Sequence, residues 1–209
     1  MEGIVKIMAD LVFYYGAMGC SKTANALMTR FQYIDKGLNV WLVKPATDTR
    51  DDVVNEDGSV TAIVKSRVGI SAEADVIPAA GSPFQLLSKK LQDGMPIHLT
   101  IVDEAQFLTE DQVDEFKAIA ETLGIPVYCY GLRTDFRTKL FPGSARLFEI
   151  CSKAVELESI CSCGKPAIIN ARFSKGRLMT RGAQVDIGGD EKYKALCYSC
   201  WKNLAKEND

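Results

Sequence analysis

The sequence predicts an α/β protein, in which helices cover a mostly parallel sheet and a small second unit follows. Within residues 1–158, apolar runs typical of buried strands alternate with segments whose apolar residues recur every three or four positions. Near residue 160 this alternation stops, and two close cysteine pairs, short strand-like stretches and many glycines follow. We therefore predict one domain over residues 1–158 and a second over residues 159–209.

The first strand, helix and second strand are predicted over residues 11–43. Residues 11–15 form an apolar and aromatic run that ends at a glycine, which is typical of a buried strand. A helical pattern follows, with an apolar face made of Ala24, Leu27, Met28, Phe31 and Ile34. Gly37 is a natural end for this helix, and residues 40–43 predict the next strand.

The later elements are predicted from the same two signals, apolar runs for strands and apolar residues at every third or fourth position for helices. Residues 47–82 are polar and rich in turn formers, so we expect weak strands there at best. A short helix over residues 84–91 precedes a strand over residues 97–102. Thr109 and Gln112 form a capping-box pattern at the start of a helix that Gly124 ends. Its apolar face consists of Val113, Phe116, Ile119, Ala120 and Leu123. Strands over residues 127–130 and 154–157 complete the predicted sheet.

Composition narrows the class of protein. The chain has 209 residues, of which 47% are hydrophobic and 25% charged, so a disordered or fibrous protein is excluded. The formal net charge of −2 argues against a generic binder of nucleic-acid backbones. No apolar stretch approaches the roughly 18 residues that a membrane span needs, and we see no secretory signal. We expect a cytoplasmic protein with reduced thiols and neither nucleic acid nor membrane as a partner.

A glycine-rich turn joins the first predicted strand to the first helix. Its residues are Gly16, Ala17, Met18, Gly19, Cys20, Ser21, Lys22 and Thr23. In a P-loop at this position, backbone N–H groups cradle phosphates, the lysine reaches the β and γ oxygens, and the hydroxyl binds Mg²⁺. The strict pattern has a glycine where Ser21 stands, and a positive φ there would cost a serine about 1 kcal/mol. The alternative interpretation is a small-residue turn with a capping serine.

Two adjacent acids, Asp103 and Glu104, end the predicted strand over residues 97–102. In an open α/β sheet ligands bind at the carboxyl ends of strands, so these acids are expected to face the P-loop. One carboxylate can hold Mg²⁺ while the other takes a proton from a nucleophile. A pair of solvated acids at a strand end is the alternative, which the order of the two motifs along the chain disfavours.

The two cysteine pairs predict a structural zinc site. The pairs are Cys161 with Cys163 and Cys197 with Cys200. Tetrahedral zinc takes four such ligands from two turns, and Gly164 suits a turn after the first pair. Four protein ligands leave no open position for catalysis. A chance cluster of thiols or a redox pair is the alternative.

A zinc-ribbon P-loop ATPase acting on nucleic acid is the alternative function. Residues 161–209 contain nine basic and five acidic side chains, which suits such a module. Residues 1–160 contain sixteen basic and twenty-two acidic side chains, a poor surface for a polyanion. The chain is also short for a motor, so a phosphoryl transferase fits better.

These motifs resemble the type II thymidine kinase family, which combines a RecA-like ATP domain with a small zinc-binding domain. The resemblance covers nearly the whole chain. The matching segments are residues 15–23, Lys44, residues 48–50, residues 103–107, residues 131–136, Phe141 and residues 184–193. The first cysteine pair departs from the family pattern, because its CxC spacing replaces CxxC.

The resemblance implies transfer of the γ-phosphoryl group of ATP to the 5′-hydroxyl of thymidine, and more weakly of deoxyuridine, in nucleotide salvage for DNA synthesis. Glu104 would be the general base. ATP and its phosphates would bind residues 16–23, Asp103, Gln106 and Arg50, with Mg²⁺ near Thr23 and Asp103. A solvated surface arginine is the alternative interpretation of Arg50.

The resemblance also implies a nucleoside pocket and partners. The residues of this pocket would be Met18, Phe107, Leu132, Phe136, Phe141, Gln184, Val185, Asp186, Ile187 and Tyr193. Met18, Leu132 and Tyr193 would surround the thymine methyl group, and the last residues belong to a lid over the base. Without the resemblance, the three phenylalanines would be taken for ordinary core residues. A homotetramer and feedback inhibition by thymidine triphosphate are further expectations.

Overall fold

The computed structural model describes residues 9–182, 184 and 192–206. The elements of the larger part are β1 (Leu11–Gly16), α1 (Lys22–Asp35), β2 (Val40–Pro45), β3 (Val53–Val54), β4 (Val60–Thr61), β5 (Ile63–Lys65), β6 (Ser71–Glu73), β7 (Asp75–Ile77), α2 (Pro83–Gln92), β8 (Leu99–Val102), η1 (Ala105–Phe107), α3 (Glu110–Ala118), η2 (Ile119–Leu123), β9 (Val127–Leu132), α4 (Pro142–Ile150) and β10 (Lys153–Glu156). The remaining elements are β11 (Ile169–Ser174), β12 (Arg177–Met179), β13 (Tyr193–Leu196) and α5 (Tyr198–Lys206).

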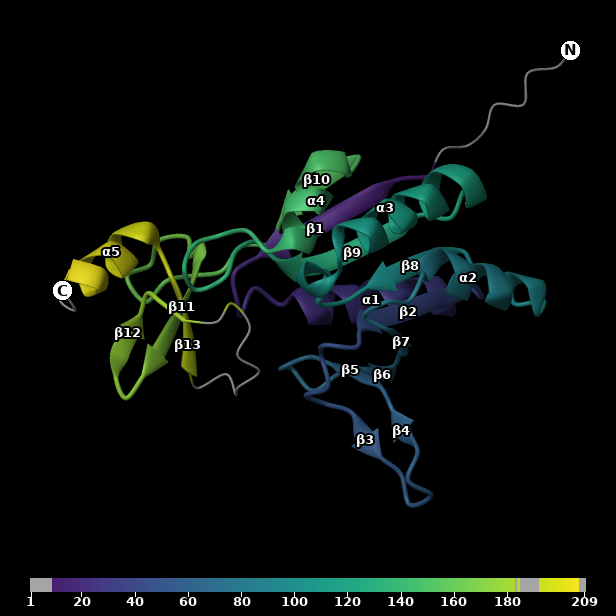
Figure 1. The fold of residues 1–209 in the computed structure, drawn as a ribbon, viewed down its shortest axis with the longest axis horizontal. Helices are drawn as coiled ribbons and strands as arrows, with labels where there is room; N and C mark the ends of the chain where they lie inside the picture. The colour runs from purple at the N-terminus through teal and green to yellow at the C-terminus, as the bar shows by residue number, and fades with distance from the viewer. Residues whose placement is uncertain (1–8, 183, 185–191, 207–209) are drawn as a thin grey trace, which may run out of the picture.

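Among the described residues, six strands form one sheet in the order β10-β1-β9-β8-β2-β7, and every pair is parallel. The predicted α/β class with a mostly parallel sheet is therefore confirmed. A separate antiparallel sheet, β12-β11-β13, lies with α5 at one end of the molecule (Figure 1). The boundary predicted between residues 158 and 159 falls between β10 and β11, and the division into two domains stays a prediction.

Both faces of the large sheet are buried, as parallel sheets require. Along β8, Ile101 packs with Leu27 of α1 on one face. The next residue, Val102, belongs to the core on the other face, where Phe116 of α3 and Leu147 of α4 also lie. Because side chains alternate along a strand, each apolar run supplies both layers.

The predicted ends of the helices agree with the structure. Thr109 and Gln112 form a capping box at the start of α3, and Gly124 has φ 68° just after the closing turn. Gly37 has φ 75°, two residues after α1. The α1 face was predicted only in part, because Met28, Phe31 and Ile34 are exposed while Ala24 and Leu27 are buried.

Residues 47–82 contain more pairing than the sequence predicts. β3 pairs with β4 and β5 pairs with β6, each as a short antiparallel hairpin, and β7 joins the large sheet beside β2. The β3–β4 hairpin projects away from the body of the protein (Figure 1). Among the described residues, no helix has both the length and the apolar character needed to cross a membrane.

Candidate active site

The turn between β1 and α1 has the backbone that a P-loop needs. Gly19 and Ser21 both have positive φ, at 79° and 62°. Ser21 stands just before α1, and its side chain makes no capping hydrogen bond, so the interpretation of a capping serine is wrong. A Cβ on Gly16 would lie 2.3 Å from the carbonyl oxygen of Leu157, which explains the glycine at the end of β1.

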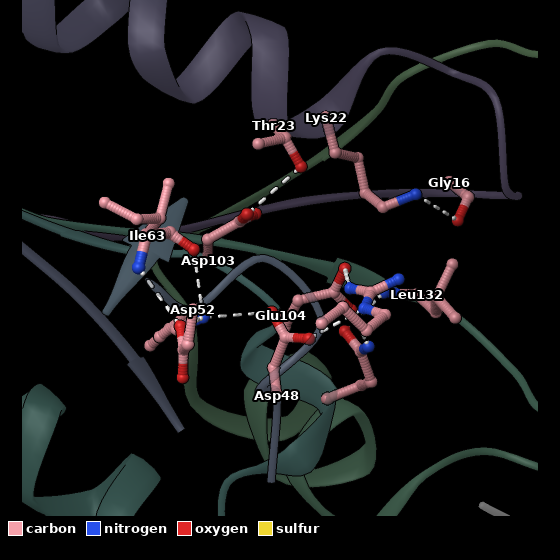
Figure 2. Close-up of polar contacts among 12 residues, drawn as sticks. Gly16, Lys22, Thr23, Asp48, Asp52, Ile63, Asp103, Glu104 and Leu132 are labelled. Carbon is pink, nitrogen blue, oxygen red and sulfur yellow. Dashed lines mark hydrogen bonds and ion pairs between the residues drawn. The ribbon is translucent and has the colours of Figure 1, made fainter. Parts of the chain in front are cut away.

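Lys22 and Thr23 begin α1 and point toward different partners (Figure 2). The ammonium group of Lys22 donates to the carbonyl oxygens of Gly16 at 3.3 Å and Ala17 at 2.9 Å. The Thr23 hydroxyl donates to Asp103 Oδ2 at 3.0 Å, across the gap between α1 and the end of β8. Burial raises the pKa of Asp103 to about 7, the charge of Glu104 adds to this, and the Thr23 hydrogen bond opposes it. A hydroxyl beside a carboxylate is a donor set that fits Mg²⁺.

Glu104 faces the other way from Asp103 because its backbone lies in the left-handed region at φ 51°. Its Oε1 accepts from Arg50 Nη2 at 2.5 Å, and its Oε2 accepts from Gln106 Nε2. Gln106 is buried, and its Oε1 accepts from the Leu132 N–H at 2.9 Å. Arg50 and Gln106, predicted at the phosphates, thus both contact the carboxylate of Glu104. The charge of Glu104 raises the pKa of Arg50.

A series of ion pairs that supports Arg50 was not predicted from the sequence. Arg50 Nε donates to Asp48 Oδ1 at 2.7 Å, and the fully buried Lys44 lies 3.8 Å from Asp48 Oδ2. Lys44 also donates to Asp52 Oδ1 at 2.6 Å. Buried charges are stable only when paired, so this series of ion pairs holds Arg50 in place. The sequence motifs include Lys44 and residues 48–50. Their ion pairs could not be predicted, because they form within a loop that has no helical or strand periodicity.

One cavity of about 880 Å³ is lined by most of the candidate catalytic, phosphate-binding and nucleoside-binding residues. The site residues predicted from the sequence that line this cavity are Met18, Gly19, Ser21, Lys22, Thr23, Arg50, Asp103, Glu104, Gln106, Phe107, Leu132, Phe136, Phe141, Gln184 and Tyr193. Ala17 and Cys20 are buried and, like Gly16, are absent from this lining. Val185, Asp186 and Ile187 lie outside the described residues.

The three predicted phenylalanines are also packed against other side chains. Phe107 and Phe141 meet edge to face at 5.8 Å between ring centroids, and Phe136 is 1% exposed. The Arg172 guanidinium lies 3.8 Å from the centroid of Phe136. Each ring thus borders the cavity on one side and is packed on another. The packing expected of core residues is present, and the role of these rings in nucleoside binding stays a prediction.

Asn170, on β11, is a cavity residue that the sequence analysis missed. Its side chain is buried, accepts from the Met18 N–H at 2.7 Å and donates to the Thr134 carbonyl at 2.8 Å. It therefore ties the P-loop to the loop after β9. An isolated asparagine in an apolar strand was the available signal, because a buried amide requires partners.

The four cysteines of the two pairs come together. The sulfur atoms of Cys161, Cys163, Cys197 and Cys200 all lie within 4.8 Å of one another. Backbone N–H groups of Cys163 and Cys197 lower the pKa of Cys161 to about 6, which favours the thiolate that binds metal. Gly164, with φ 83°, closes the tight turn that lets a CxC pair take the place of CxxC. The donor set fits structural zinc.

Comparison with known proteins agrees with this site. The sequence profile of the family described as "Thymidine kinase" matches residues 9–201. The thymidine kinase of Enterobacteria phage T4 is 42% identical over 96% of this chain and 99% of its own length. The thymidine kinase of Yersinia pseudotuberculosis is 38% identical over 95% of this chain and 97% of its own length. That of Zymomonas mobilis is 39% identical over 91% of this chain and 94% of its own length. With this match over most of the chain, the protein belongs to the thymidine kinase family.

Proposed function

We propose that this enzyme transfers the γ-phosphoryl group of ATP to the 5′-hydroxyl of thymidine, giving thymidine monophosphate and ADP. The observation that carries the proposal is the single cavity in which a P-loop, a carboxylate and an apolar pocket meet. Phosphoryl transfer needs such positioning, because most of its catalysis is alignment and charge stabilisation.

Each side chain at the end of β8 has a separate task in this proposal. Glu104 accepts the proton of the 5′-hydroxyl, and Arg50 and Gln106 hold its two oxygens in place. Lys22 and the N–H groups of residues 19–23 bind the phosphates. Thr23 and Asp103 would hold Mg²⁺, which when bound neutralises charge on the phosphate oxygens.

The apolar part of the cavity supports recognition of thymine. Met18, Leu132 and Tyr193 would surround the 5-methyl group, and Phe107, Phe136 and Phe141 form aromatic walls. A slot of this kind distinguishes one methyl group by about 1–3 kcal/mol, so deoxyuridine is expected to be a poorer substrate that is still accepted.

Four further properties belong to the same proposal. Cys161, Cys163, Cys197 and Cys200 hold a structural zinc ion. Thymidine triphosphate, formed by further phosphorylation of the product, inhibits the enzyme by feedback. The enzyme acts in the cytoplasm. It is a homotetramer, which the exposed apolar face of α1 supports.

An ADP-release assay with a panel of nucleosides tests the proposal. We expect turnover with thymidine, weaker turnover with deoxyuridine and little with purine nucleosides. A parallel assay with single-stranded DNA in place of a nucleoside tests the alternative function, an ATPase that nucleic acid stimulates. Stimulation by DNA without a thymidine requirement would contradict the proposed function.

A further inference from the structure

The β5–β6 hairpin ends in a tight turn made of residues 66–69. The Gly69 N–H donates to the Ser66 carbonyl at 3.0 Å, and the Ser66 N–H donates to the Ile70 carbonyl at 2.9 Å. The Ser66 hydroxyl donates to the same carbonyl at 3.1 Å. Gly69 has φ 92°, a conformation that glycine adopts without strain. The tip of this hairpin therefore has a defined shape.

The base of the hairpin is fixed by a buried ionic contact. Lys44 donates to the Ile63 carbonyl at 2.9 Å, and Asp52 Oδ1 accepts both from Lys44 at 2.6 Å and from the Ile63 N–H at 3.1 Å. Val64 is 2% exposed and packs in the core beneath α1, together with Leu27. These contacts determine the direction in which the hairpin points.

The tip points at the phosphate-binding loop. Residues 64–69 line the same cavity as Lys22, Thr23 and Glu104. A Cβ built on Gly19 would lie 3.8 Å from Arg67 Nη1, so the guanidinium of Arg67 lies beside the P-loop backbone. Lys22, the cation of the motif itself, contacts the carbonyls of Gly16 and Ala17.

We propose that Arg67 is a further catalytic residue, which binds the γ-phosphate of ATP and stabilises the charge on its oxygens during transfer. This rests on the proposed function. The thymidine 5′-oxygen forms a bond to the γ-phosphorus as the bond to the β–γ bridging oxygen breaks, and that electron pair leaves with ADP. The proton of the 5′-hydroxyl goes to Glu104. Arg67 exchanges no proton or covalent bond, and its planar fork of N–H donors suits phosphate oxygens.

The experiment compares Arg67→Met and Arg67→Lys with the wild-type full chain. Arg177→Met, which removes an exposed arginine on β12 outside the cavity, is the matched control. Turnover is measured with thymidine and MgATP, and equilibrium affinity is measured for MgATP and MgADP. We expect Arg67→Met to lower kcat by about 10³-fold or more, in the range found for arginines that contact a transferred phosphoryl group. Arg67→Lys should retain part of the rate.

The ratio of ATP to ADP affinity separates this role from a structural one. Arg67→Met should weaken ATP binding at least several-fold and leave ADP binding and the melting temperature unchanged, because ADP lacks the γ-phosphate. In an Arg67→Ala variant, added guanidinium ion at a non-denaturing concentration should restore part of kcat. A kcat within twofold of wild type, or equal losses of ATP and ADP affinity, would overturn the proposal. A wild-type enzyme inactive on thymidine would refute the proposed function instead, while the affinity ratio would still test Arg67.

Discussion

Two neighbouring carboxylates, Asp103 and Glu104, have different partners because of one backbone turn. Glu104 has φ 51°, which directs its side chain to Arg50 and Gln106 while Asp103 points at Thr23. The left-handed conformation costs a non-glycine residue about 1 kcal/mol or more, and the contacts of the glutamate offset it. The sequence predicted the two acids at the end of this strand and a separate role for each. It could not predict Arg50 as the partner of Glu104, because the contact joins residues 54 positions apart.

Glu104→Gln should abolish turnover and leave ATP binding nearly intact. The amide keeps the shape of the side chain but cannot accept the proton, and loss of a general base costs about 10²–10⁴-fold in rate. Single-turnover phosphoryl transfer and ATP affinity are measured side by side, with Glu156→Gln on the exposed edge of β10 as the control. More than a few per cent of the wild-type kcat in Glu104→Gln would rule out the general-base role.

Ser21→Gly should stabilise the protein. Ser21 occupies the left-handed region at φ 62° without a capping hydrogen bond, so glycine removes strain of about 1–2 kcal/mol. The greater freedom of glycine in the unfolded chain offsets about 0.4–1 kcal/mol of this. The melting temperature should rise by up to about 6 °C. Ser174→Gly, at the end of β11, has no such strain to relieve and serves as control. A lower melting temperature for Ser21→Gly would contradict the strain argument.

At the scale of elements, β11 connects the cysteine cluster to the active-site cavity. Its residues alternate: Ala171 and Phe173 pack in the core that contains Cys161 and Cys197, and Asn170 and Arg172 face the other way. Asn170 contacts Met18, and Arg172 lies on the ring of Phe136. The position of β11 therefore determines the position of two side chains that contact residues of the cavity lining, Asn170 at Met18 and Arg172 at Phe136.

Removal of the proposed zinc ion should raise the thymidine KM far more than the ATP KM. Without the metal, the turns at residues 161–164 and 197–200 lose the bonds that join them, and β11 loses its support from that core. Steady-state kinetics are measured before and after chelation, with metal loss verified by elemental analysis and zinc re-addition as the reversal. Cys163→Ser should reproduce the effect, and Cys151→Ser, outside the cluster, should not. An unchanged thymidine KM in verified zinc-free enzyme would exclude this coupling.

The β5–β6 hairpin shows which elements the sequence does not reveal. Each strand has three residues, too few for a period of two to stand out from a polar segment. The hairpin is held in place by the buried Lys44–Asp52 contact at its base, and both of these residues lie outside the hairpin's own segment. The four central strands of the large sheet, by contrast, are mostly apolar runs because both of their faces are largely buried.

At the scale of the whole molecule, the sequence predicted the architecture and the residues of the cavity better than the surface. P-loop, paired acids and cysteine pairs are motifs whose chemistry requires fixed spacings, so they could be located without a structure. The helical period of α1 predicted an apolar face but not what covers it. Met28, Phe31 and Ile34 are 59%, 67% and 43% exposed, whereas the pattern alone suggests burial. The helical period of apolar residues is the same whether the apolar face packs within its own chain or against another chain.

The exposed face of α1 supports the proposed assembly of subunits, and Phe31→Lys should test it. The three side chains follow one another at steps of three along α1, so they form one stripe on its surface. Lysine is a good helix former, so the helix should persist while the stripe gains a charge. Sedimentation velocity should show a tetramer for the wild type and smaller species for Phe31→Lys. Met95→Lys, a similar change at an exposed methionine outside α1, should leave the tetramer intact. A monomeric wild type, or an unaltered tetramer in Phe31→Lys, would show that this face is not a subunit interface.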